Sequence, residues 1–392
     1  MSARRVLVVP KWYPWPDRPV FGTFCREQAR AVAARNEVVV LASDAVHSPS
    51  FASFELSDSV EDGIRTMRLR YRRPLVRPAA MGFNIQGAVA ALRRLRRDGF
   101  RPDVVHAHVY SAALPALVLA RLSGAPLVIS EHYTGFQRGL VRGSDRLVAR
   151  TAFRRAALLA PVSQDLASTL KPLAGDTPMH VVPNVVDTDV FHPPGDPRED
   201  GPARLLCVGW LAEKKGHADL LEALARLGRD DVVLDIVGEG ELRAQLGERA
   251  GALGVAERVR FLGPRLREEV ADHMRAADLF VLPSHFENLP VVLIEAMASG
   301  LPSVATRVGG VPELIDDEVG TLAPARDPEA LASAIASTLD RRREFDPAAL
   351  ASRARGRYGY EAVGRIWDEV YDSASSSGSA SSATTRAAAS RS

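Results

Sequence analysis

Short runs of β-branched and other apolar residues alternate with longer amphipathic segments along the chain, and this alternation restricts the possible fold more than any other feature. Alternation of this kind favours parallel sheets, because consecutive parallel strands need a helical crossover. Expected strands of the first half are residues 6–9, 38–41, 104–106, 127–130, 158–160 and 180–182. Those of the second half are 204–208, 232–237, 259–262, 279–282, 303–305 and 321–322. We therefore predict an α/β chain with two Rossmann-like domains.

Length and local composition define the expected domains. A chain of 392 residues exceeds the usual size of one core. A stretch rich in Pro, Gly and Asp follows residue 192, which gives domains at 1–192 and 193–357. Aromatic and apolar residues recur at helical spacing over 358–372, so this segment should pack on a domain. Residues 373–392 are mainly Ser, Ala, Thr and Gly, and we expect a disordered tail there.

The composition excludes several classes of protein. Apolar residues make up 46% and charged residues 25% of the chain, as in ordinary globular domains. The two cysteines, Cys25 and Cys207, form no CxxC pair, so we expect neither a disulfide framework nor a cysteine metal site. No apolar run reads as a secretion signal or approaches the length of about 20 residues that spans a bilayer. We expect a cytoplasmic protein, at most peripheral on the inner face of the membrane.

The net charge of +2 hides opposite charges in the two halves. Residues 1–192 contain 26 Lys and Arg against 16 Asp and Glu, whereas residues 193–372 contain 22 against 32. The first half has a cluster of arginines: Arg65, Arg68, Arg70, Arg72, Arg73, Arg77, Arg93, Arg94, Arg96 and Arg97. A solvated face explains such a cluster, and attraction to anionic lipid headgroups is the alternative. We do not expect a nucleic-acid partner, because no nucleic-acid-binding motif is present.

A helix start in the second half provides a candidate anion site. A strand is expected to end at Leu282, and Pro290 stands where a helix could begin, since its missing N–H is harmless there. The free N–H groups of Val291 and Val292, together with the helix dipole, would suit a diphosphate.

Two carboxylates flank this anion site. Glu295 lies four residues after Val291 and therefore on the same helix face, and Glu287 lies in the loop just ahead. Carboxylates beside a phosphate suit sugar and ribose hydroxyls better than the phosphate itself. Taken alone, both could be ordinary surface or capping groups. The pair Gly309–Gly310 could add backbone donors or form a simple turn.

Residues 287–295 (ENLPVVLIE) resemble the EX7E motif of the retaining glycosyltransferases of family four. Five other segments resemble segments of that family: 128–136 (VISEHYTGF), 181–193 (VVPNVVDTDVFHP), 208–217 (VGWLAEKKGH), 237–243 (VGEGELR) and the helix 358–372. The resemblance covers residues 1–372. It implies the GT-B fold, in which two Rossmann-like domains face a central cleft. The first domain would bind the acceptor, the second the nucleotide-sugar donor, and the last helix would cross back onto the first domain.

The resemblance also implies roles for single residues. Glu287 matches the glutamate that approaches the transferred sugar, and Glu295 the one that binds the ribose. Lys215 matches the lysine on the donor phosphates, His132 the histidine near the transferred sugar, and Gly22 the glycine that lets backbone approach the diphosphate. A plain structural role is the alternative for His132.

The remaining candidate donor-binding residues are Asn288, Leu289, Val291, Val292, Gly209 and Arg265. One position departs from the family pattern: Trp210 stands where many members have an arginine that grips the phosphates. Lys214, Arg265 or Arg267 would then have to supply that cation. His106 and His108 end a strand, where we expect at most one to face the cleft, and we predict no metal site from them.

The implied reaction is a hexosyl transfer from UDP- or GDP-hexose to a glycan, lipid-linked or small-molecule acceptor, with retention and without a metal or other cofactor. Cell-envelope or polysaccharide biosynthesis would use such a reaction. The alternatives are a nucleotide-sugar 2-epimerase and a non-catalytic sugar-nucleotide-binding module. A dehydrogenase is disfavoured, because no GxGxxG follows the first strand.

Overall fold

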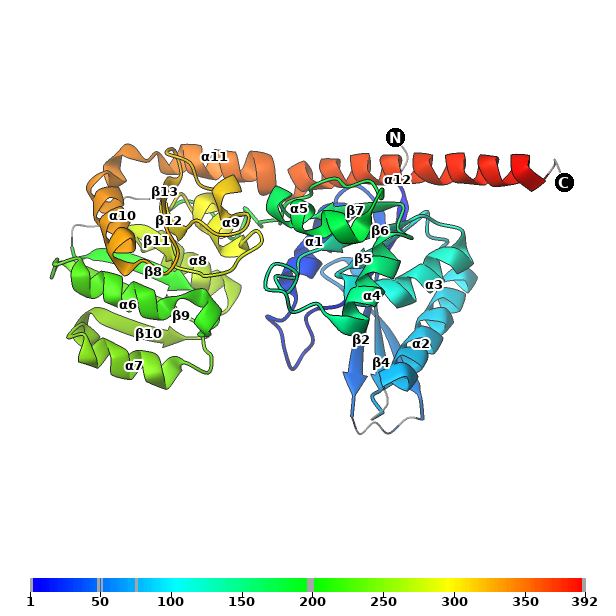
Figure 1. The fold of residues 1–392 in the computed structure, drawn as a ribbon, viewed down its shortest axis with the longest axis horizontal. Coiled ribbons are helices and arrows are strands. Elements are labelled where there is room, and N and C mark those ends of the chain that lie inside the picture. Colours follow the sequence, from blue (N-terminus) through cyan, green and yellow to red (C-terminus); the bar gives the residue numbers. More distant parts are fainter. Residues whose placement is uncertain (1–2, 48–49, 51, 75–76, 196–200, 390–392) are drawn as a thin grey trace. The chain divides into compact units, whose positions relative to one another are not determined.

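The computed structural model describes residues 3–47, 50, 52–74, 77–195 and 201–389 (Figure 1). The chain forms two compact units: unit 1 is Met1–Pro183 with Val363–Ser392, and unit 2 is Asn184–Ala362. Unit 2 thus begins before the expected boundary at residue 192. The reason is that residues after Pro183 bond within unit 2. The side-chain amide of Asn184 donates to the carbonyl of Leu289 at 2.6 Å, and the N–H of Val186 to the carbonyl of Tyr358 at 2.8 Å.

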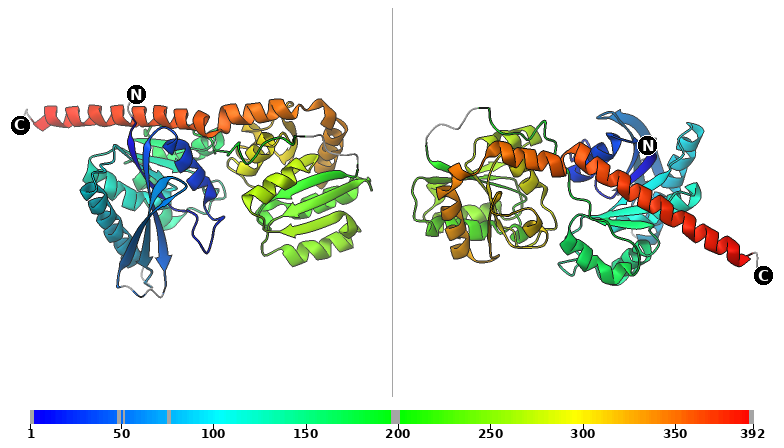
Figure 2. Two further views of the ribbon diagram at one scale, coloured as in Figure 1. Left: turned by 180° about the vertical axis from the view of Figure 1, so that it is seen from behind. Right: turned by 90° about the horizontal axis from the view of Figure 1, so that it is seen from above.

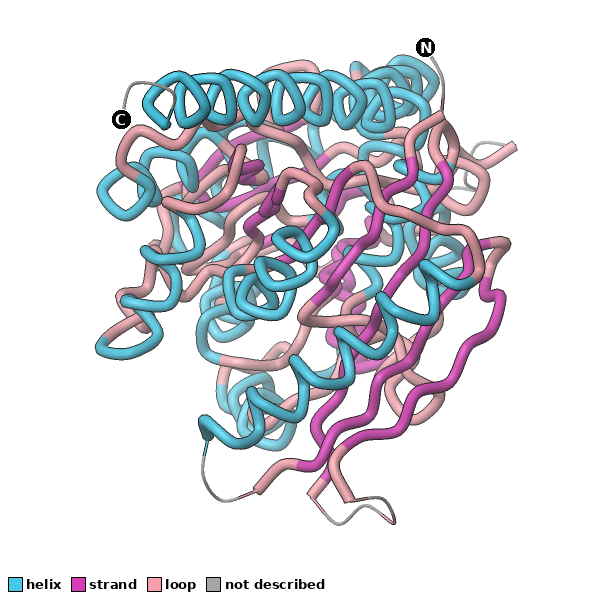
Figure 3. Tube along the Cα trace, turned by 90° about the vertical axis from the view of Figure 1, so that its right-hand side faces the viewer, coloured by secondary structure: helices cyan, strands magenta, loops and turns pink. Residues whose placement is uncertain are grey.

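Unit 1 is built on one seven-stranded sheet in the order β3-β4-β2-β1-β5-β6-β7. Its elements are β1 (Arg5–Pro10), α1 (Thr23–Ala33), β2 (Glu37–Val46), β3 (Phe54–Glu61), β4 (Ile64–Arg72), α2 (Arg77–Arg97), β5 (Val104–His108), η1 (Tyr110–Ala112), α3 (Ala113–Ser123), β6 (Leu127–Glu131), α4 (Gly143–Phe153), β7 (Leu158–Pro161), α5 (Gln164–Ala174) and most of α12 (Tyr360–Ala389). All neighbouring strands are parallel except β3 and β4, which form an antiparallel hairpin at one edge (Figure 3).

Five of the six strands expected in the first half are present, and the β3–β4 hairpin was not expected from the sequence. The sequence of β4 has no apolar run, because buried Met67 and Leu69 alternate with arginines. Arg65 pairs with Asp58, and Arg68 with Glu61, across the hairpin at 2.7 and 2.6 Å. Residues 180–182 donate N–H groups to the edge strand β7 without forming a strand.

Unit 2 contains a six-stranded sheet, parallel throughout, in the order β10-β9-β8-β11-β12-β13. Its elements are β8 (Ala203–Val208), η2 (Glu213–Lys215), α6 (His217–Arg226), β9 (Val232–Val237), α7 (Arg243–Ala252), η3 (Ala256–Arg258), β10 (Val259–Gly263), α8 (Arg267–Arg275), β11 (Leu279–Leu282), α9 (Val291–Ala298), β12 (Ser303–Thr306), η4 (Val311–Glu313), β13 (Gly320–Ala323), α10 (Pro328–Asp340), η5 (Arg342–Glu344) and α11 (Pro347–Tyr358). All six expected strands are present.

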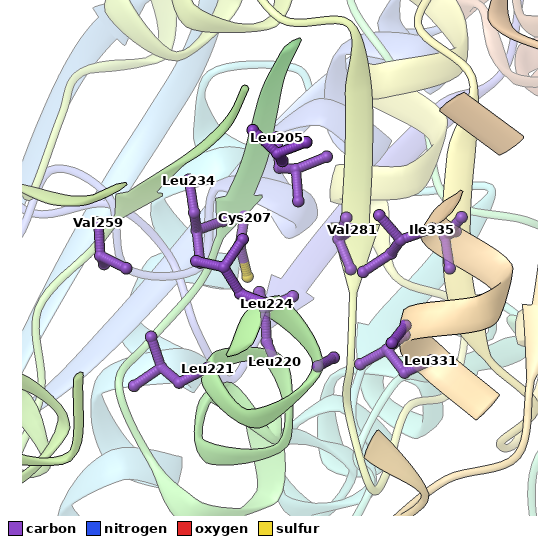
Figure 4. Packing of buried hydrophobic residues seen from close by; sticks show 14 of the residues in the cluster. Leu205, Cys207, Leu220, Leu221, Leu224, Leu234, Val259, Val281, Leu331 and Ile335 are labelled. Carbon is purple, nitrogen blue, oxygen red and sulfur yellow. The ribbon is translucent and has the colours of Figure 1, made fainter. Parts of the chain in front are cut away.

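The core of unit 2 lies between the sheet and helices α6 and α10. Leu205 and Leu234 from the strands belong to the same buried cluster as Leu220 and Leu224 of α6, which are four residues apart and share a helix face (Figure 4). Ile335 of α10 belongs to this cluster as well. This packing fixes the strands whose carboxyl ends carry the candidate site.

Both sheets contain a point where the strand order reverses between two parallel strands. In unit 2, β8 lies between β9 and β11, so the loops after β8 and β11 leave in opposite directions. Ligands of open α/β sheets bind at such a switch point. These two loops are residues 209–216 and 283–290, and the predicted site residues that they contain are Gly209, Lys215, Glu287, Asn288 and Leu289. In unit 1 the corresponding strand is β1, between β2 and β5, and the loop after β1 ends at Gly22.

Helix α12 packs on unit 1 from Val363 onward (Figure 2). Trp367 is fully buried and its indole N–H donates to Gln28 at 2.7 Å, while Asp368 pairs with Arg35 at 2.6 Å. The helix continues to Ala389, through the Ser/Ala-rich segment for which we expected disorder. Continuing a packed helix needs no new nucleus, and alanine favours it. Residues 390–392 lie outside the described part.

No helix in the described part of the chain is long and apolar enough to cross a membrane.

Candidate functional site

Lys215 and Glu287 form an ion pair in unit 2. Lys215 Nζ donates to Glu287 Oε1 at 2.5 Å, and Ser284 Oγ donates to the same oxygen at 2.8 Å. Glu287 is buried, with 7% of its surface exposed. Burial of a carboxylate is costly unless it is paired and hydrogen-bonded, and these two donors meet both conditions. The residues that we assign to the sugar and to the phosphates therefore meet at one point.

The loop that carries Lys215 depends on one glycine. Gly216 ends the turn η2 with φ +67°, in the left-handed region that favours glycine. A Cβ atom there would lie 2.0 Å from the carbonyl oxygen of Pro283. The N–H of His285 donates to the carbonyl of Lys214 at 2.8 Å. The loop after β8 thus packs backbone against backbone on the loop after β11.

Helix α9 begins directly after this loop. Pro290 is its N-cap with φ −69°, as the sequence predicts. The N–H groups of Val291 and Val292 belong to the first turn, where no helix carbonyl is available to accept them. Val291, Val292 and Glu295 are partly exposed, whereas the other residues of α9 are buried. Glu295 therefore shares the partly exposed side of the helix with Val291 and Val292.

Three residues hold the loop 283–290 in place, and two of them, Ser284 and Asn184, were not among the candidate site residues. Ser284 bonds Glu287, and its signal is a small polar residue three positions ahead of the motif. Asn184 bonds the carbonyl of Leu289 and belongs to the segment 181–193. The N–H of Gly310 donates to the carbonyl of Asn288 at 2.8 Å, so the glycine pair contacts the loop through its backbone.

Gly209 and Trp210 follow β8. The N–H of Gly209 donates to the carbonyl of Val237 at 3.0 Å. A Cβ atom on Gly238 would lie 2.0 Å from the carbonyl oxygen of Gly209, so the two backbones touch. Trp210 is 53% exposed, and its indole N–H donates to Glu241 at 2.8 Å.

The arginines considered as phosphate ligands make other contacts. Arg265 Nη1 donates to the carbonyl of Pro264 at 3.3 Å, and Arg265 Nε lies 3.8 Å from Glu269. Arg267 pairs with Asp187 at 3.6 Å and lies over the ring of Phe191. Within the described contacts, the structure joins Lys215 to Glu287 and does not join Arg265 to this pair.

Gly22 and His132 lie in neighbouring loops of unit 1. Gly22 has φ +76°, and a Cβ atom there would lie 2.4 Å from the carbonyl carbon of Trp12. The Trp12 ring lies 5.8 Å from that of Tyr133. The ring of Phe24 lies 4.9 Å from that of His132. Aromatic contacts thus join the loop after β1 to the loop after β6.

The expectation that at most one of His106 and His108 faces the cleft used the wrong geometry. Residues two apart in a strand point to the same face of a sheet. The two rings stack with centroids 4.3 Å apart, and both residues are fully buried.

Glu131 ends β6 and holds the loop that begins with His132. Its carboxylate accepts the N–H groups of Tyr110, His132 and Tyr133, each at 2.9 Å. Burial raises the pKa of Glu131 to about 7, against the opposing effect of these three donors. The residue fixes the backbone of His132 and was not selected from the sequence.

No group of three or more His, Cys, Asp or Glu side chains within the described residues has a geometry suited to a metal ion.

Comparison with known families gives two matches that together span most of the chain. Residues 192–357 match the family described as glycosyl transferases group 1. Residues 21–190 match the family described as Glycosyltransferase Family 4.

Individual proteins give the same result. The chain is 31% identical to a glycogen synthase of Mycobacterium tuberculosis (strain H37Rv) over 371 residues, which is 90% of this chain and 88% of that protein. It is 35% identical to a D-inositol 3-phosphate glycosyltransferase of Catenulispora acidiphila, over 69% of this chain and 70% of that one. The crystal structure of Anabaena HepE in complex with UDP and glucose matches with a TM-score of 0.72 at 19% identity, covering 94% of this chain and 100% of that one. The chain therefore belongs to the family-four glycosyltransferases and has the GT-B fold.

Proposed function

We propose that this glycosyltransferase is a retaining hexosyltransferase that moves the sugar of a UDP- or GDP-hexose to a glycan, lipid-linked or small-molecule acceptor in cell-envelope or polysaccharide biosynthesis. The observation that carries the proposal is the pairing of Lys215 with Glu287 directly ahead of α9. This arrangement joins a cation, a carboxylate and a helix N-terminus at the switch point of one sheet.

The proposed chemistry is departure of a nucleoside diphosphate from the anomeric carbon. Negative charge grows on the departing phosphate, so groups fixed in advance around it lower the barrier most. Lys215 and the amides of Val291 and Val292 supply such groups. Glu295 would bind the ribose, and His132 would lie near the transferred sugar.

Lys215 and Glu287 exchange partners in this proposal. In the absence of a donor each neutralises the other, at 2.5 Å. A diphosphate competes for Lys215, and the released Glu287 carboxylate can then accept hydrogen bonds from sugar hydroxyls. Ser284 keeps one bond to Glu287 during this change. Donor binding thereby prepares both the phosphate end and the sugar end of the site.

The acceptor hydroxyl would attack on the face that the phosphate leaves. The departing phosphate would take its proton, so no protein base, metal or other cofactor is assigned. Exclusion of water from the donor site would protect the donor from hydrolysis.

The test is a thermal-shift series of the full chain with UDP, GDP, ADP and their hexoses. A ligand at about 100 times its Kd stabilises the native state by about 2.7 kcal/mol. For a unit of this size that corresponds to a shift of roughly 5–10 °C, at about 2–4 °C per kcal/mol. The shift should disappear in Glu295→Ala and persist in Glu248→Ala, a matched change at an exposed glutamate of α7.

Turnover then separates the proposal from its alternatives. Transfer to an acceptor with retained anomeric configuration, unaffected by a chelator, is the expected result. Donor binding without donor consumption across an acceptor panel would instead indicate a non-catalytic module, for which the exposed Trp210 is the best support. Free sugar formed without any acceptor would indicate a 2-epimerase.

A membrane-associated acceptor is a further part of the proposal, with the protein cytoplasmic and peripheral on the inner face of the membrane. Arg65, Arg68 and Arg94 pair with carboxylates and add little net charge. The other exposed arginines of the cluster include Arg72, Arg73, Arg93 and Arg97. Each would contribute about 1 kcal/mol near an anionic surface. Failure to sediment with anionic liposomes at low salt would refute this part.

A further inference from the structure

A second bridge lies beside the Lys215–Glu287 pair and joins the same two segments of unit 2. His285 Nε2 lies 2.8 Å from Asp219 Oδ2. His285 belongs to the loop 283–290 and precedes Glu287 by two positions, whereas Asp219 lies in the first turn of α6, four positions after Lys215. We call His285 and Asp219 the outer pair. The outer pair and the Lys215–Glu287 pair therefore connect the same parts of the chain.

The outer pair is largely shielded from solvent. The side chain of His285 is 7% exposed and that of Asp219 is 21% exposed. An ionised carboxylate only accepts hydrogen bonds, so the ring nitrogen Nε2 is the donor, and the bond forms whether or not Nδ1 also carries a proton. Hydrogen bonds to a charged group are roughly twice as strong as neutral ones. The outer pair can therefore hold its two segments together.

His285 contacts the segment around Lys215 at three places. Its backbone N–H donates to the carbonyl of Lys214 at 2.8 Å. Its ring lies against Gly216, where an added Cβ atom would be 3.3 Å from His285 Cδ2. The third place is the ring bond to Asp219, whose own N–H donates to the carbonyl of Gly216 at 3.0 Å. Lys215 therefore lies in a segment that one residue holds on both sides.

Apolar packing contributes little to holding this segment. None of the three residues of the turn η2, which contains Lys215, is buried. A cavity of about 350 Å³ adjoins the turn, and its walls include Ala212, Gly216, Leu246 and the outer pair. A segment beside a cavity has fewer contacts to restrain it than one in a packed core. The hydrogen bonds of the outer pair therefore supply a restraint that packing does not.

The position of Lys215 matters because its charge acts on a reacting atom. A lysine carries a point charge at the end of a flexible four-carbon stem. Lys215 Nζ donates to Glu287 at 2.5 Å, and in the proposed function it then bonds the departing phosphate. A charge that is fixed in advance stabilises the transition state without rearrangement, whereas a displacement of about 1 Å can cost about 100-fold in rate.

We propose that His285 and Asp219 are positioning residues that hold Lys215 in place against Glu287 and, during transfer, against the departing phosphate. This inference rests on the proposed function, in which Lys215 acts on the donor phosphates. Both residues act through Lys215 and are assigned no contact with the donor. Loss of the outer pair should therefore change the rate of transfer more than the binding of the donor.

A spectroscopic test uses the full chain and does not depend on activity. The four lysines of the sequence are Lys11, Lys171, Lys214 and Lys215. Side-chain ¹⁵Nζ–¹³Cε correlation therefore gives few signals, and Lys215→Met assigns that of Lys215. In the wild type we expect this signal to differ from that of the exposed Lys171, because Lys215 bonds a buried carboxylate. Asp219→Ala and His285→Phe should each move it toward the Lys171 signal.

Matched variants separate positioning from folding. His285→Gln keeps a side-chain N–H for Asp219 and should keep the wild-type signal, whereas His285→Phe keeps a ring beside Gly216 without a donor. Glu329→Ala removes a carboxylate from the first turn of α10, as Asp219→Ala does from α6, so it controls for the helix dipole and should resemble the wild type. Asp219 is partly exposed, so Asp219→Ala keeps the test in force even where His285→Phe fails to fold.

Kinetics with the identified donor and acceptor test the route through Lys215. In Asp219→Ala and His285→Phe we expect kcat to fall about tenfold with KM changed less than about threefold, as for a displacement smaller than the 1 Å that costs about 100-fold. His285→Gln should restore kcat. In a Lys215→Met background the same two changes should alter kcat less than about twofold, because the residue through which they act is gone.

A Lys215 signal that stays unchanged in both Asp219→Ala and His285→Phe would overturn the proposal. So would an equal fall in kcat with and without Lys215. The spectra also separate this proposal from the proposed function. The expected change of the Lys215 signal in a protein that transfers no sugar would support the hold of the outer pair on Lys215 and refute the transferase role.

Discussion

Replacement of Gly216 by alanine should disable the candidate site while leaving the fold in place. The added Cβ would lie 2.0 Å from the carbonyl oxygen of Pro283, whereas an ordinary contact needs about 3.4 Å. The loop after β8 must therefore retreat by more than about 1 Å. Lys215, the preceding residue, would move with it and lose its 2.5 Å contact with Glu287.

Two effects of this change have different magnitudes. A left-handed backbone costs an alanine about 1–2 kcal/mol, and this cost lowers the stability of unit 2. A displacement of about 1 Å at a reacting site can cost about 100-fold in rate. Gly228 provides the matched control, because it has φ +62° and nothing within 4 Å of an added Cβ atom.

We therefore expect Gly228→Ala to lower the free energy of unfolding by about 1–2 kcal/mol with kcat unchanged. Gly216→Ala should lose at least as much stability, and its kcat should fall between about 10- and 100-fold. Urea unfolding and initial-rate kinetics on the identified donor measure the two quantities. Equal kcat values for the two variants would refute the claim that the contact of Gly216 with Pro283 positions Lys215.

Three further predictions concern neighbouring positions. Ser284→Ala removes one of the two donors to the buried Glu287 carboxylate, so the free energy of unfolding should fall by about 1–3 kcal/mol in urea titrations, whereas Ser284→Thr should restore it. Glu131 has a pKa raised to about 7, so between pH 4.5 and 7 the folded state keeps a proton that the unfolded state releases. The free energy of unfolding should therefore fall as the pH rises through this window, by at most about 1.4 kcal/mol per pH unit. Glu131→Gln should flatten this pH dependence. Gly22→Ala places a Cβ atom 2.4 Å from Trp12 and should lower the thermal midpoint more than Gly124→Ala, which has a similar φ of +75° and open space around it; equal midpoints would contradict the close approach.

Local sequence patterns determined most of the secondary structure. All six strands of unit 2 and five strands of unit 1 are where apolar runs predict them, because a strand buried on both faces is apolar along its length. Pro290 likewise predicts the start of α9. The β3–β4 hairpin escaped prediction, because its arginines are neutralised by carboxylates on the facing strand, and facing strands are not visible in a local pattern. The continuation of α12 to Ala389 was not predicted, because the composition of residues 373–392 was considered without the helix that precedes them.

The sequence by itself therefore determined that the chain has two parallel-sheet domains and that a helix with an exposed N-terminus and two flanking carboxylates follows β11. Only the tertiary structure decided which side chains from distant parts of the chain contact one another. Lys215 and Glu287 are 72 positions apart, and Tyr371 and His106 are 265 apart. The first pair forms because sheet order brings the ends of distant strands together, and the second because helix α12 packs back on unit 1. No local pattern of residues contains that information.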